Sequence, residues 1–358
     1  MILSQLEIQH FRNIENASLS PHPALNLISG QNGAGKSSIL EAIQCLATGH
    51  SFRTRKPREL ISHTSESYQI TSTFSNDQTQ REHRAGLIRR RDGTLQLRFD
   101  YEDIKSQAEI TRHLPVKAIT PDSHRLVQEG PDERRQFLDW GLFHVEPAFH
   151  QHWKQYRRAL SQRNQLLREN GSDKDIKVWT DPFVYSAQAI HEARTRYVQS
   201  LTEIVNSRQT NLKTRFHVEL SYRCGWDNSK HLAHLLDERL PNHRKMKTTT
   251  DGPHRADIHL TTDNIPIKHV LSRGQQKLLV YLLHLSQLDL LRKITSRQAI
   301  ILCDDLISEL DEEATRALLA DLFQIKSQVY ITGIDLSTLQ HQSHAMFHME
   351  HGLVKKGL

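Results

Sequence analysis

Cysteine, glycine and proline are all scarce in this chain of 358 residues. Its three cysteines, Cys45, Cys224 and Cys303, lie far apart in the sequence, which excludes both the closely spaced pair of a zinc site and a disulfide framework. With 15 glycines and 11 prolines, the composition is not that of a fibrous or low-complexity protein. No apolar run approaches the roughly 20 residues that a membrane-spanning helix needs.

The first residues also lack the basic segment and apolar stretch of a secretory signal. Charged residues make up 25% and apolar residues 37% of the chain, and the formal net charge is +6. This composition predicts a soluble protein of the reducing cytosol, and the small positive charge favours a nucleic-acid partner only slightly. The length allows two or three domains of about 100–200 residues each.

A strand, a glycine-bearing loop and a helix are predicted in that order between residues 25 and 48. Residues 25–30 form a short apolar run, and the apolar residues after Lys36 recur at helical spacing. Residues 68–74 and 84–100 alternate and are rich in strand-forming residues, with Asp92-Gly93 as a turn between strands. We expect these last segments to form an antiparallel patch beside the first strand.

The pattern becomes helical in the middle of the chain. Apolar and aromatic residues recur every three or four positions over 149–167 and again over 183–212, with a polar segment at 169–175 between them. These patterns predict an antiparallel helical hairpin whose aromatic residues form a core. Strands are predicted again at 218–222, 256–267, 299–303 and 329–332, and a helix after Gly274.

The fold class expected from this order is α/β, with an inserted, mostly helical domain. Residues 1–114 and 246–358 are predicted to form one α/β domain, and residues 115–245 an arm inserted between its two halves.

The strongest motif fits the pattern G-x-x-x-x-G-K-[ST] of a phosphate-binding P-loop and lies between the predicted strand and helix. Backbone N–H groups and the helix N-terminus would bind phosphate oxygens. Lys36 would reach the β- and γ-phosphates, and the Ser37 hydroxyl would bind Mg²⁺. The alternative, a glycine-rich turn without a ligand, does not account for this context. The predicted ATP-binding residues are Gly30, Gln31, Asn32, Gly33, Ala34, Gly35, Lys36, Ser37 and Ser38.

Two adjacent acids follow the apolar segment 299–303. A buried strand that ends in an acid holds the metal of P-loop ATPases from the side opposite the loop, so Asp304 is predicted to bind Mg²⁺. Asp305 could orient or deprotonate the attacking water, and with Lys36 it is the predicted catalytic pair. Without the P-loop, the two acids could equally cap a helix.

A third motif resembles the signature of ABC-type ATPases, which is normally L-S-x-G-x. Ser272 and the Gly274 backbone would begin a helix whose N-terminus faces a γ-phosphate, and in that superfamily the phosphate belongs to the other subunit. Taken alone, the motif could be an ordinary capped helix. Residues 308–311 resemble the D-loop that follows the acidic pair in this superfamily. The predicted signature residues are Leu271, Ser272, Arg273, Gly274 and Gln275.

The whole chain resembles the RecF family of the SMC-like ABC ATPases. The interval between the P-loop and the signature fits a short helical arm, without the long coiled coil of full SMC proteins. The resemblance also includes one departure, Ala256, where the family often has an acid. Besides the three ATPase motifs, it rests on Phe11-Arg12-Asn13, Ser51-Phe52-Arg53-Thr54, Gly130-Pro131 with Arg134-Arg135 and Asp139, and Asp251-Gly252-Pro253-His254-Arg255.

The resemblance implies an ABC-type ATPase head with an inserted helical arm, and a cytoplasmic DNA-repair and replication protein with no membrane partner. It implies that ATP and Mg²⁺ bind, that two copies close head to head, and that slow hydrolysis reopens them. It implies DNA binding at junctions of single-stranded gaps and duplex, without sequence specificity. It also implies a partnership with RecR and RecO that loads RecA during recombination and the SOS response to DNA damage. Arg12 and Asn13 are nucleotide contacts by resemblance only.

A DNA-binding surface is predicted between residues 52 and 98. This segment carries ten Arg and Lys residues against five acids, and Arg89, Arg90 and Arg91 stand together at the predicted hairpin. Such residues would contact phosphates without reading bases. A solvated charged face is the competing interpretation.

Two other function classes fit parts of the sequence. The ATP-binding subunit of an ABC transporter would share the ATPase motifs but would dock a membrane partner and leave DNA unbound. A DNA clamp with a relic nucleotide site would need no hydrolysis, against which the intact Lys36, Ser37, Asp304 and Asp305 argue.

Overall fold

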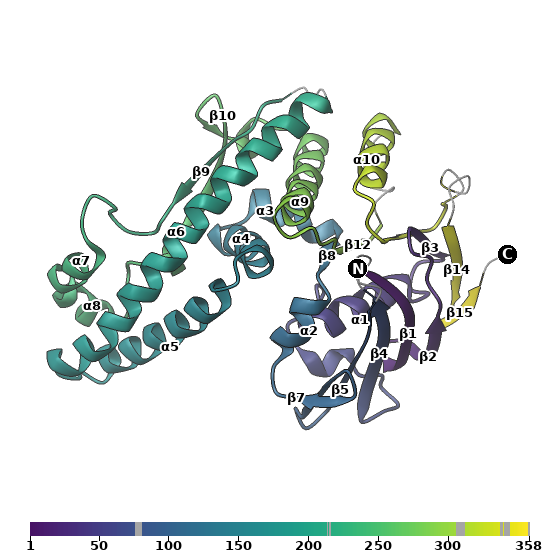
Figure 1. Cartoon of the computed structure of the whole chain (residues 1–358), viewed down its shortest axis with the longest axis horizontal. Helices are drawn as coiled ribbons and strands as arrows, with labels where there is room; N and C mark the ends of the chain where they lie inside the picture. Colours follow the sequence, from purple (N-terminus) through teal and green to yellow (C-terminus); the bar gives the residue numbers. More distant parts are fainter. Residues whose placement is uncertain are drawn as a thin grey trace. The chain divides into compact units, whose positions relative to one another are not determined.

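The computed structural model describes residues 1–75, 81–212, 214, 216–305, 312–336, 339 and 344–356 (Figure 1). The chain separates into two compact units. The first contains Met1–Ser123, Lys277–Leu288 and Ser296–Leu358, and the second contains His124–Gln276 and Asp289–Thr295. No helix of the described residues is long and apolar enough to cross a membrane.

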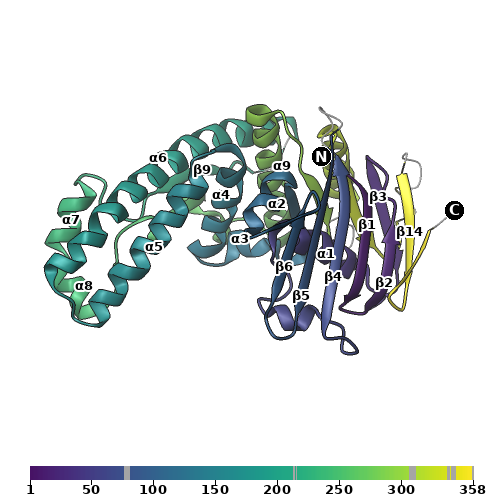
Figure 2. The same ribbon diagram turned by 60° about the horizontal axis from the view of Figure 1, so that its bottom comes forward.

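One sheet of the first unit is antiparallel, with the strand order β2-β1-β4-β5-β6-β7 (Figure 2). Ile8 of β1 pairs with Ile70 of β4, and both side chains are buried. Side chains on alternate positions of β4 and β5 are buried, as expected for a sheet with one face on a core. The strands are β1 (Ile2–Phe11), β2 (Ile14–Leu19), β4 (Ser67–Ser75), β5 (Glu82–Arg90), β6 (Leu95–Phe99) and β7 (Glu102–Ile104).

The second sheet of this unit has the order β15-β14-β3-β13-β12-β8 and is parallel except for the pairing of β14 with β15. Every residue of β12 and β13 is buried, which explains the uninterrupted apolar sequence of β12. The strands are β3 (Leu25–Gly30), β8 (Val116–Ile119), β12 (Ile300–Cys303), β13 (Val329–Gly333), β14 (His344–Glu350) and β15 (Leu353–Lys356).

Helix α1 (Lys36–Thr48) lies between the two sheets and contacts strands of both. Its residues Ile39, Leu40 and Ile43 are fully buried in one core with side chains from the two sheets. The helix ends at Gly49, whose φ of 75° lets its N–H bond the Cys45 carbonyl. The remaining helical elements of this unit are η1 (Pro57–Leu60), α2 (Gln107–His113), η2 (Pro121–His124, which reaches the unit boundary) and α10 (Glu312–Gln324).

The second unit is mostly helical. Helices α5 (Phe149–Arg168) and α6 (Asp173–Asn211) run side by side and form the predicted hairpin, and the side chain of Ser172 caps α6 (Figure 1). Its other helical elements are α3 (Arg125–Gln128), α4 (Pro131–Val145), α7 (Leu232–Glu238), α8 (Leu240–Met246), η3 (Pro253–Arg255) and η4 (Ile267–His269). Its small sheet contains β9 (Glu219–Arg223), β10 (Asp257–Thr262) and β11 (Ile265–Pro266). Helix α9 (Arg273–Thr295) has segments in both units.

Two motifs of the family resemblance lie in this unit and have structural partners. The Arg134 guanidinium binds both carboxylate oxygens of Asp257, at 2.7 and 3.0 Å. Arg194, which is fully buried, donates two hydrogen bonds to Asp139. These ion pairs tie α4 to β10 and to α6.

The two units do not begin and end where the predicted domains do. Residues 116–119, which were expected in the arm, form β8 and pair with β12 in the parallel sheet. Residues 257–262, which were expected in the α/β domain, form β10 and pair with β9 of the second unit. Strand pairing, which short apolar runs do not reveal, accounts for both differences. The predicted antiparallel patch is confirmed, and the predicted D-loop at 308–311 lies outside the described residues.

Candidate nucleotide site

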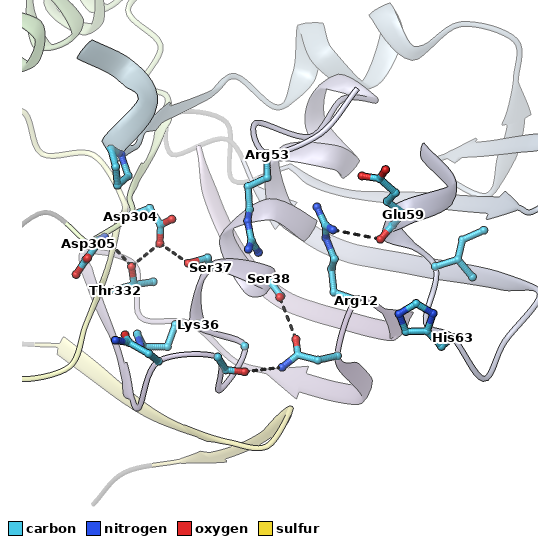
Figure 3. A pocket seen from close by; sticks show the side chains of 16 residues that line it. Arg12, Lys36, Ser37, Ser38, Arg53, Glu59, His63, Asp304, Asp305 and Thr332 are labelled. Carbon is cyan, nitrogen blue, oxygen red and sulfur yellow. Dashed lines mark hydrogen bonds between the residues drawn. The ribbon is translucent and has the colours of Figure 1, made fainter. Parts of the chain in front are cut away.

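A pocket of about 500 Å³ lies in the first unit, at the carboxyl ends of β3, β12 and β13 and the N-terminus of α1 (Figure 3). This edge of a parallel sheet is where ligands of open α/β folds bind. The pocket is lined by Arg12, Asn13, Asn32, Gly33, Gly35, Lys36, Ser37, Ser38, Arg53, Glu59, Ile61, His63, Pro121, Asp304, Asp305 and Thr332.

The P-loop connects β3 to α1 and depends on its glycines. Gly30 has a φ of 149°, and a Cβ there would lie 2.5 Å from the carbonyl oxygen of Met349 on the neighbouring β14. Gly35 has a φ of 110° directly before the helix. The Lys36 Nζ donates hydrogen bonds to the carbonyl oxygens of Gly30 at 2.8 Å and Gln31 at 3.0 Å. The ammonium group is thus held at the mouth of the loop, where a phosphate would replace the two carbonyls.

The acidic pair faces the P-loop across the pocket. Asp304 Oδ1 accepts hydrogen bonds from the Ser37 hydroxyl at 2.8 Å and from the Thr332 hydroxyl at 2.7 Å. The N–H of Asp305 donates to the Thr332 oxygen at 2.9 Å, and Asp305 has a φ of 51°. Thr332 therefore fixes both acids, although sequence reasoning missed it. Its position at the end of the buried segment 329–332 was the available signal.

Ser37 and Asp304 fit the site of a magnesium ion that also binds phosphates. A hydroxyl oxygen and a carboxylate oxygen 2.8 Å apart are hard ligands of the kind Mg²⁺ takes, and this ion usually keeps waters and phosphate oxygens in its shell. Among the described residues there is no cluster of three or more His, Cys, Asp or Glu side chains for a metal held by protein alone. Burial next to Asp304 raises the pKa of the Cys303 thiol to about 12, so this thiol stays neutral behind the site.

Asn13 and Arg12 approach the P-loop from the end of β1. The Asn13 amide donates to the Gly33 carbonyl at 3.1 Å, and its oxygen accepts from the Ser38 hydroxyl at 3.0 Å (Figure 3). Asn13 thus braces the loop against the first turn of α1. Both residues line the pocket, but their role as nucleotide contacts stays a prediction.

Glu41, which sequence reasoning also missed, organises the basic wall of the pocket. Its fully buried carboxylate accepts two hydrogen bonds from the Arg12 guanidinium, at 3.0 and 2.7 Å, and lies 3.7 Å from Arg53 Nη1. It also accepts a hydrogen bond from Ser51, whose oxygen in turn accepts from the N–H groups of Arg53 and Thr54. One carboxylate therefore positions two arginines and the loop that carries the second.

Two further residues of this wall lie at the pocket rim. Glu59 accepts hydrogen bonds from Thr54 and Lys56, which lower the pKa of its carboxyl group, and its carbonyl oxygen accepts from Arg12 Nη1 at 3.2 Å. His63 lies beside it on the pocket surface. Neither residue belongs to a recognised short motif, so the sequence offered no signal for them.

The predicted signature residues begin helix α9 in the second unit. The Ser272 N–H donates to the Gln275 side-chain oxygen at 2.9 Å, and the Gln275 N–H donates to the Ser272 hydroxyl oxygen at 3.3 Å. This reciprocal pair is a capping box. Ser272, Arg273 and Gly274 are exposed, so the N-terminus of the helix is open to a ligand or another chain.

The three predicted DNA-binding arginines differ in their surroundings. Arg89 and Arg90 end strand β5, and Arg91 stands in the turn after it. The Arg91 guanidinium donates to the carbonyl oxygens of Ser65 and Ser62, both at 2.9 Å. Arg89 pairs with the buried Tyr68 of β4, and all three arginines are half-buried.

The sequence was compared with known families and proteins. The family model described as "RecF/RecN/SMC N terminal domain" matches residues 2–354. The chain is 39% identical over 358 residues to a DNA replication and repair protein RecF of Shewanella baltica (strain OS185), with 99% of each chain covered. It is 40% identical to the protein of the same name from Shewanella oneidensis, again with 99% of each covered.

The chain belongs to the RecF family. Two solved structures of the recombination mediator protein RecF in the RecFOR pathway are each 25% identical to this chain. The structure with ATP has a TM-score of 0.90 and covers 100% of this chain and 98% of its own. The structure with ATPrS has a TM-score of 0.89 and covers 99% of this chain and 98% of its own. A solved SMC head with the ScpA winged-helix domain, at 15% identity, has a TM-score of 0.61 over 100% of this chain and 97% of that one, and shares the fold.

Family membership decides between the interpretations that the sequence left open. The RecF-type fold confirms an α/β, ABC-type ATPase head with an inserted arm, and the chain is an ATPase of this type that functions in DNA replication and repair. The interpretation as an ABC transporter subunit is wrong.

Proposed function

We propose that this protein is an ATP-controlled switch on DNA in recombinational gap repair and replication restart. The observation that carries the proposal is the hydrogen-bonded path from Ser37 through Asp304 and Thr332 to Asp305, beside a complete P-loop in a chain of the RecF family. A relic nucleotide site would have no reason to keep this path intact.

ATP binds in the pocket of the first unit. The Lys36 ammonium exchanges the Gly30 and Gln31 carbonyls for the β- and γ-phosphates, and the N-terminus of α1 adds its positive dipole end. Arg12 and Arg53 form a basic wall on the opposite side, with Glu41 compensating one of their two charges.

Hydrolysis uses the acidic pair. Ser37 and Asp304 would hold Mg²⁺, which would supply positive charge to the phosphate oxygens. Asp305 orients the attacking water and accepts its proton, a task that typically contributes about 10²–10⁴-fold to the rate. The positive φ of Asp305 and the bond from its N–H to Thr332 keep its carboxylate at the pocket surface.

ATP also controls assembly. Two copies close head to head, and residues 271–275 of each copy face the γ-phosphate in the other. The exposed, capped N-terminus of α9 suits this role because its free N–H groups favour an anion. Because a single copy also binds ATP, only the extra affinity of the closed dimer for ATP, through the contacts of residues 271–275 with the γ-phosphate, shifts the equilibrium toward closure.

The closed dimer binds DNA at junctions between single-stranded gaps and duplex, without sequence specificity. Together with RecR and RecO it helps to place RecA on the single strand, and slow hydrolysis then releases the dimer. This activity belongs to the cytoplasm and to the SOS response to DNA damage. The full-length match to RecF proteins of Shewanella supports these assignments.

Retention on DNA tests the proposal. The protein is bound to a gapped duplex in ATP and Mg²⁺, and its dissociation is measured after transfer to ATP, ADP or no nucleotide. We expect retention in ATP to exceed retention in the other two conditions at least tenfold. Equal dissociation in all three would refute the proposal, and so would retention by a variant that cannot bind ATP.

A further inference from the structure

Helix α5 of the second unit carries charge of one sign only. Its twenty residues include five lysines and arginines and no aspartate or glutamate. Its partner in the hairpin, α6, is mixed: its first turn alone contains Asp173 and Asp175. An amphipathic surface helix normally mixes charges on its exposed face for solubility, so the absence of acids along α5 points to an anionic ligand.

Four of the five cations lie on the exposed face of α5. The buried face consists of Tyr156, Ala159, Arg163 and Leu167 at helical spacing. Lys154 lies one helical turn before both Arg157 and Arg158, the spacing at which side chains are neighbours on a helix surface. The exposed cations are Lys154, Arg157, Arg158 and Arg168.

These cations have no acidic partner among the described residues. No carboxylate in the described part of the chain lies within 4.0 Å of any of the four, whereas the buried Arg163 donates hydrogen bonds to Thr180 and Thr249. Two guanidinium groups instead stack on tryptophan rings: Arg157 lies 5.6 Å from the ring centre of Trp153, and Arg158 lies 5.6 Å from that of Trp179. A stacked guanidinium keeps its full charge and loses less freedom when it binds an anion.

We propose that the outer face of α5 contacts the phosphate backbone of DNA through Lys154, Arg157 and Arg158. One lysine and two arginines within about one helical turn, both arginines stacked on tryptophan rings, complement a polyanion with a charge every few ångströms. By contrast, Arg91 of the sequence-predicted run is engaged with two carbonyls. The proposal rests on the proposed function, since it assigns a contact surface to the DNA that this function requires.

The test compares the full-length protein with the triple variant Lys154→Gln, Arg157→Gln, Arg158→Gln. Binding to gapped duplex DNA in ATP is measured at several salt concentrations. Each phosphate contact on duplex contributes about 0.9 to the slope of log K against log [salt], so the slope should fall by about 2.7 and the affinity at least tenfold. Affinity for ATP should not change, which also shows that the variant is folded.

In a matched control variant, glutamine replaces three other exposed lysines of the same unit, namely Lys174, Lys245 and Lys247. The control should keep the wild-type slope. A charge-conserving variant, Lys154→Arg with Arg157→Lys and Arg158→Lys, should recover at least half of the salt slope that the triple glutamine variant loses.

Each remaining outcome counts against the proposal. If the control loses as much slope as the triple variant, only net charge matters and the proposal fails. If the triple variant binds DNA like the wild type, the face serves an acidic protein instead and the proposal fails, while the proposed function stands. If the wild type shows no ATP-dependent DNA binding at all, both fail.

Discussion

Replacing Glu41 by glutamine should destabilise the first unit more than any other single change of charge at the pocket. The Glu41 side chain is fully buried, and its two oxygens accept hydrogen bonds from Arg12 at 2.7 and 3.0 Å. Glutamine has nearly the same shape, but its NH₂ group must face one of the two guanidinium N–H groups. Donor then meets donor, and the half-buried Arg12 loses its counter-charge.

The size of the effect follows from how much solvent the arginines reach. Breaking a fully buried pair by removing one partner costs about 3–5 kcal/mol. The Arg12 side chain is 21% exposed and that of Arg53 is 49% exposed, so water compensates part of the lost charge. We therefore expect Glu41→Gln to lower the free energy of unfolding by about 2–3 kcal/mol, which is less than for a fully buried ion pair.

Urea unfolding measures this loss directly. The midpoint should fall while the slope m stays at the wild-type value, because the surface exposed on unfolding does not change. Glu59→Gln is the control, since Glu59 lies at the same pocket on the exposed rim and should shift the midpoint much less. Equal shifts in the two variants would refute the conclusion that Glu41 organises the basic wall.

Three further predictions concern the motifs. Lys36→Ala should abolish ATP binding, because the variant loses the only P-loop cation; calorimetry that finds wild-type affinity would remove the P-loop assignment. Ser272→Arg should leave ATP binding intact but block ATP-dependent dimerisation in the ultracentrifuge, whereas Ser272→Asn, which can still cap α9, should dimerise; a dimerising Arg variant would contradict a signature that acts in trans. Reversal of Arg89, Arg90 and Arg91 to glutamate should weaken DNA binding without changing ATP affinity, and an unchanged salt slope would show a solvated face.

Much of the pocket could be predicted from sequence because its parts are local. The P-loop and the acidic pair each occupy consecutive residues, and the strand or helix beside each is marked by its own apolar pattern. Asp304 and Ser37 are far apart in the chain, but β12 and β3 both pair with β13. This pairing brings Asp304 Oδ1 to 2.8 Å from Ser37 Oγ.

The parts that sequence missed depend on long-range packing. Glu41 looks like one more charge on the polar side of α1, and only its contacts with Arg12, which follows β1, and with Ser51 reveal that it is buried. Strand β8 has four residues, too few for a periodic signal, and only its pairing with β12 assigns it to the parallel sheet. The single-sign charge of α5 was readable, but the stacking of Arg158 on Trp179 of another helix was not.

The central claim is that ATP held by this pocket keeps the protein on DNA until hydrolysis releases it. The most direct test is the lifetime on gapped DNA of Asp305→Asn, with single-turnover hydrolysis measured on the same preparation. Asn keeps the shape of the side chain but cannot accept a proton, so hydrolysis should slow by about 10²–10⁴-fold. The account predicts that the lifetime of the variant on DNA in ATP lengthens in parallel. A slowed hydrolysis with an unchanged lifetime would contradict it.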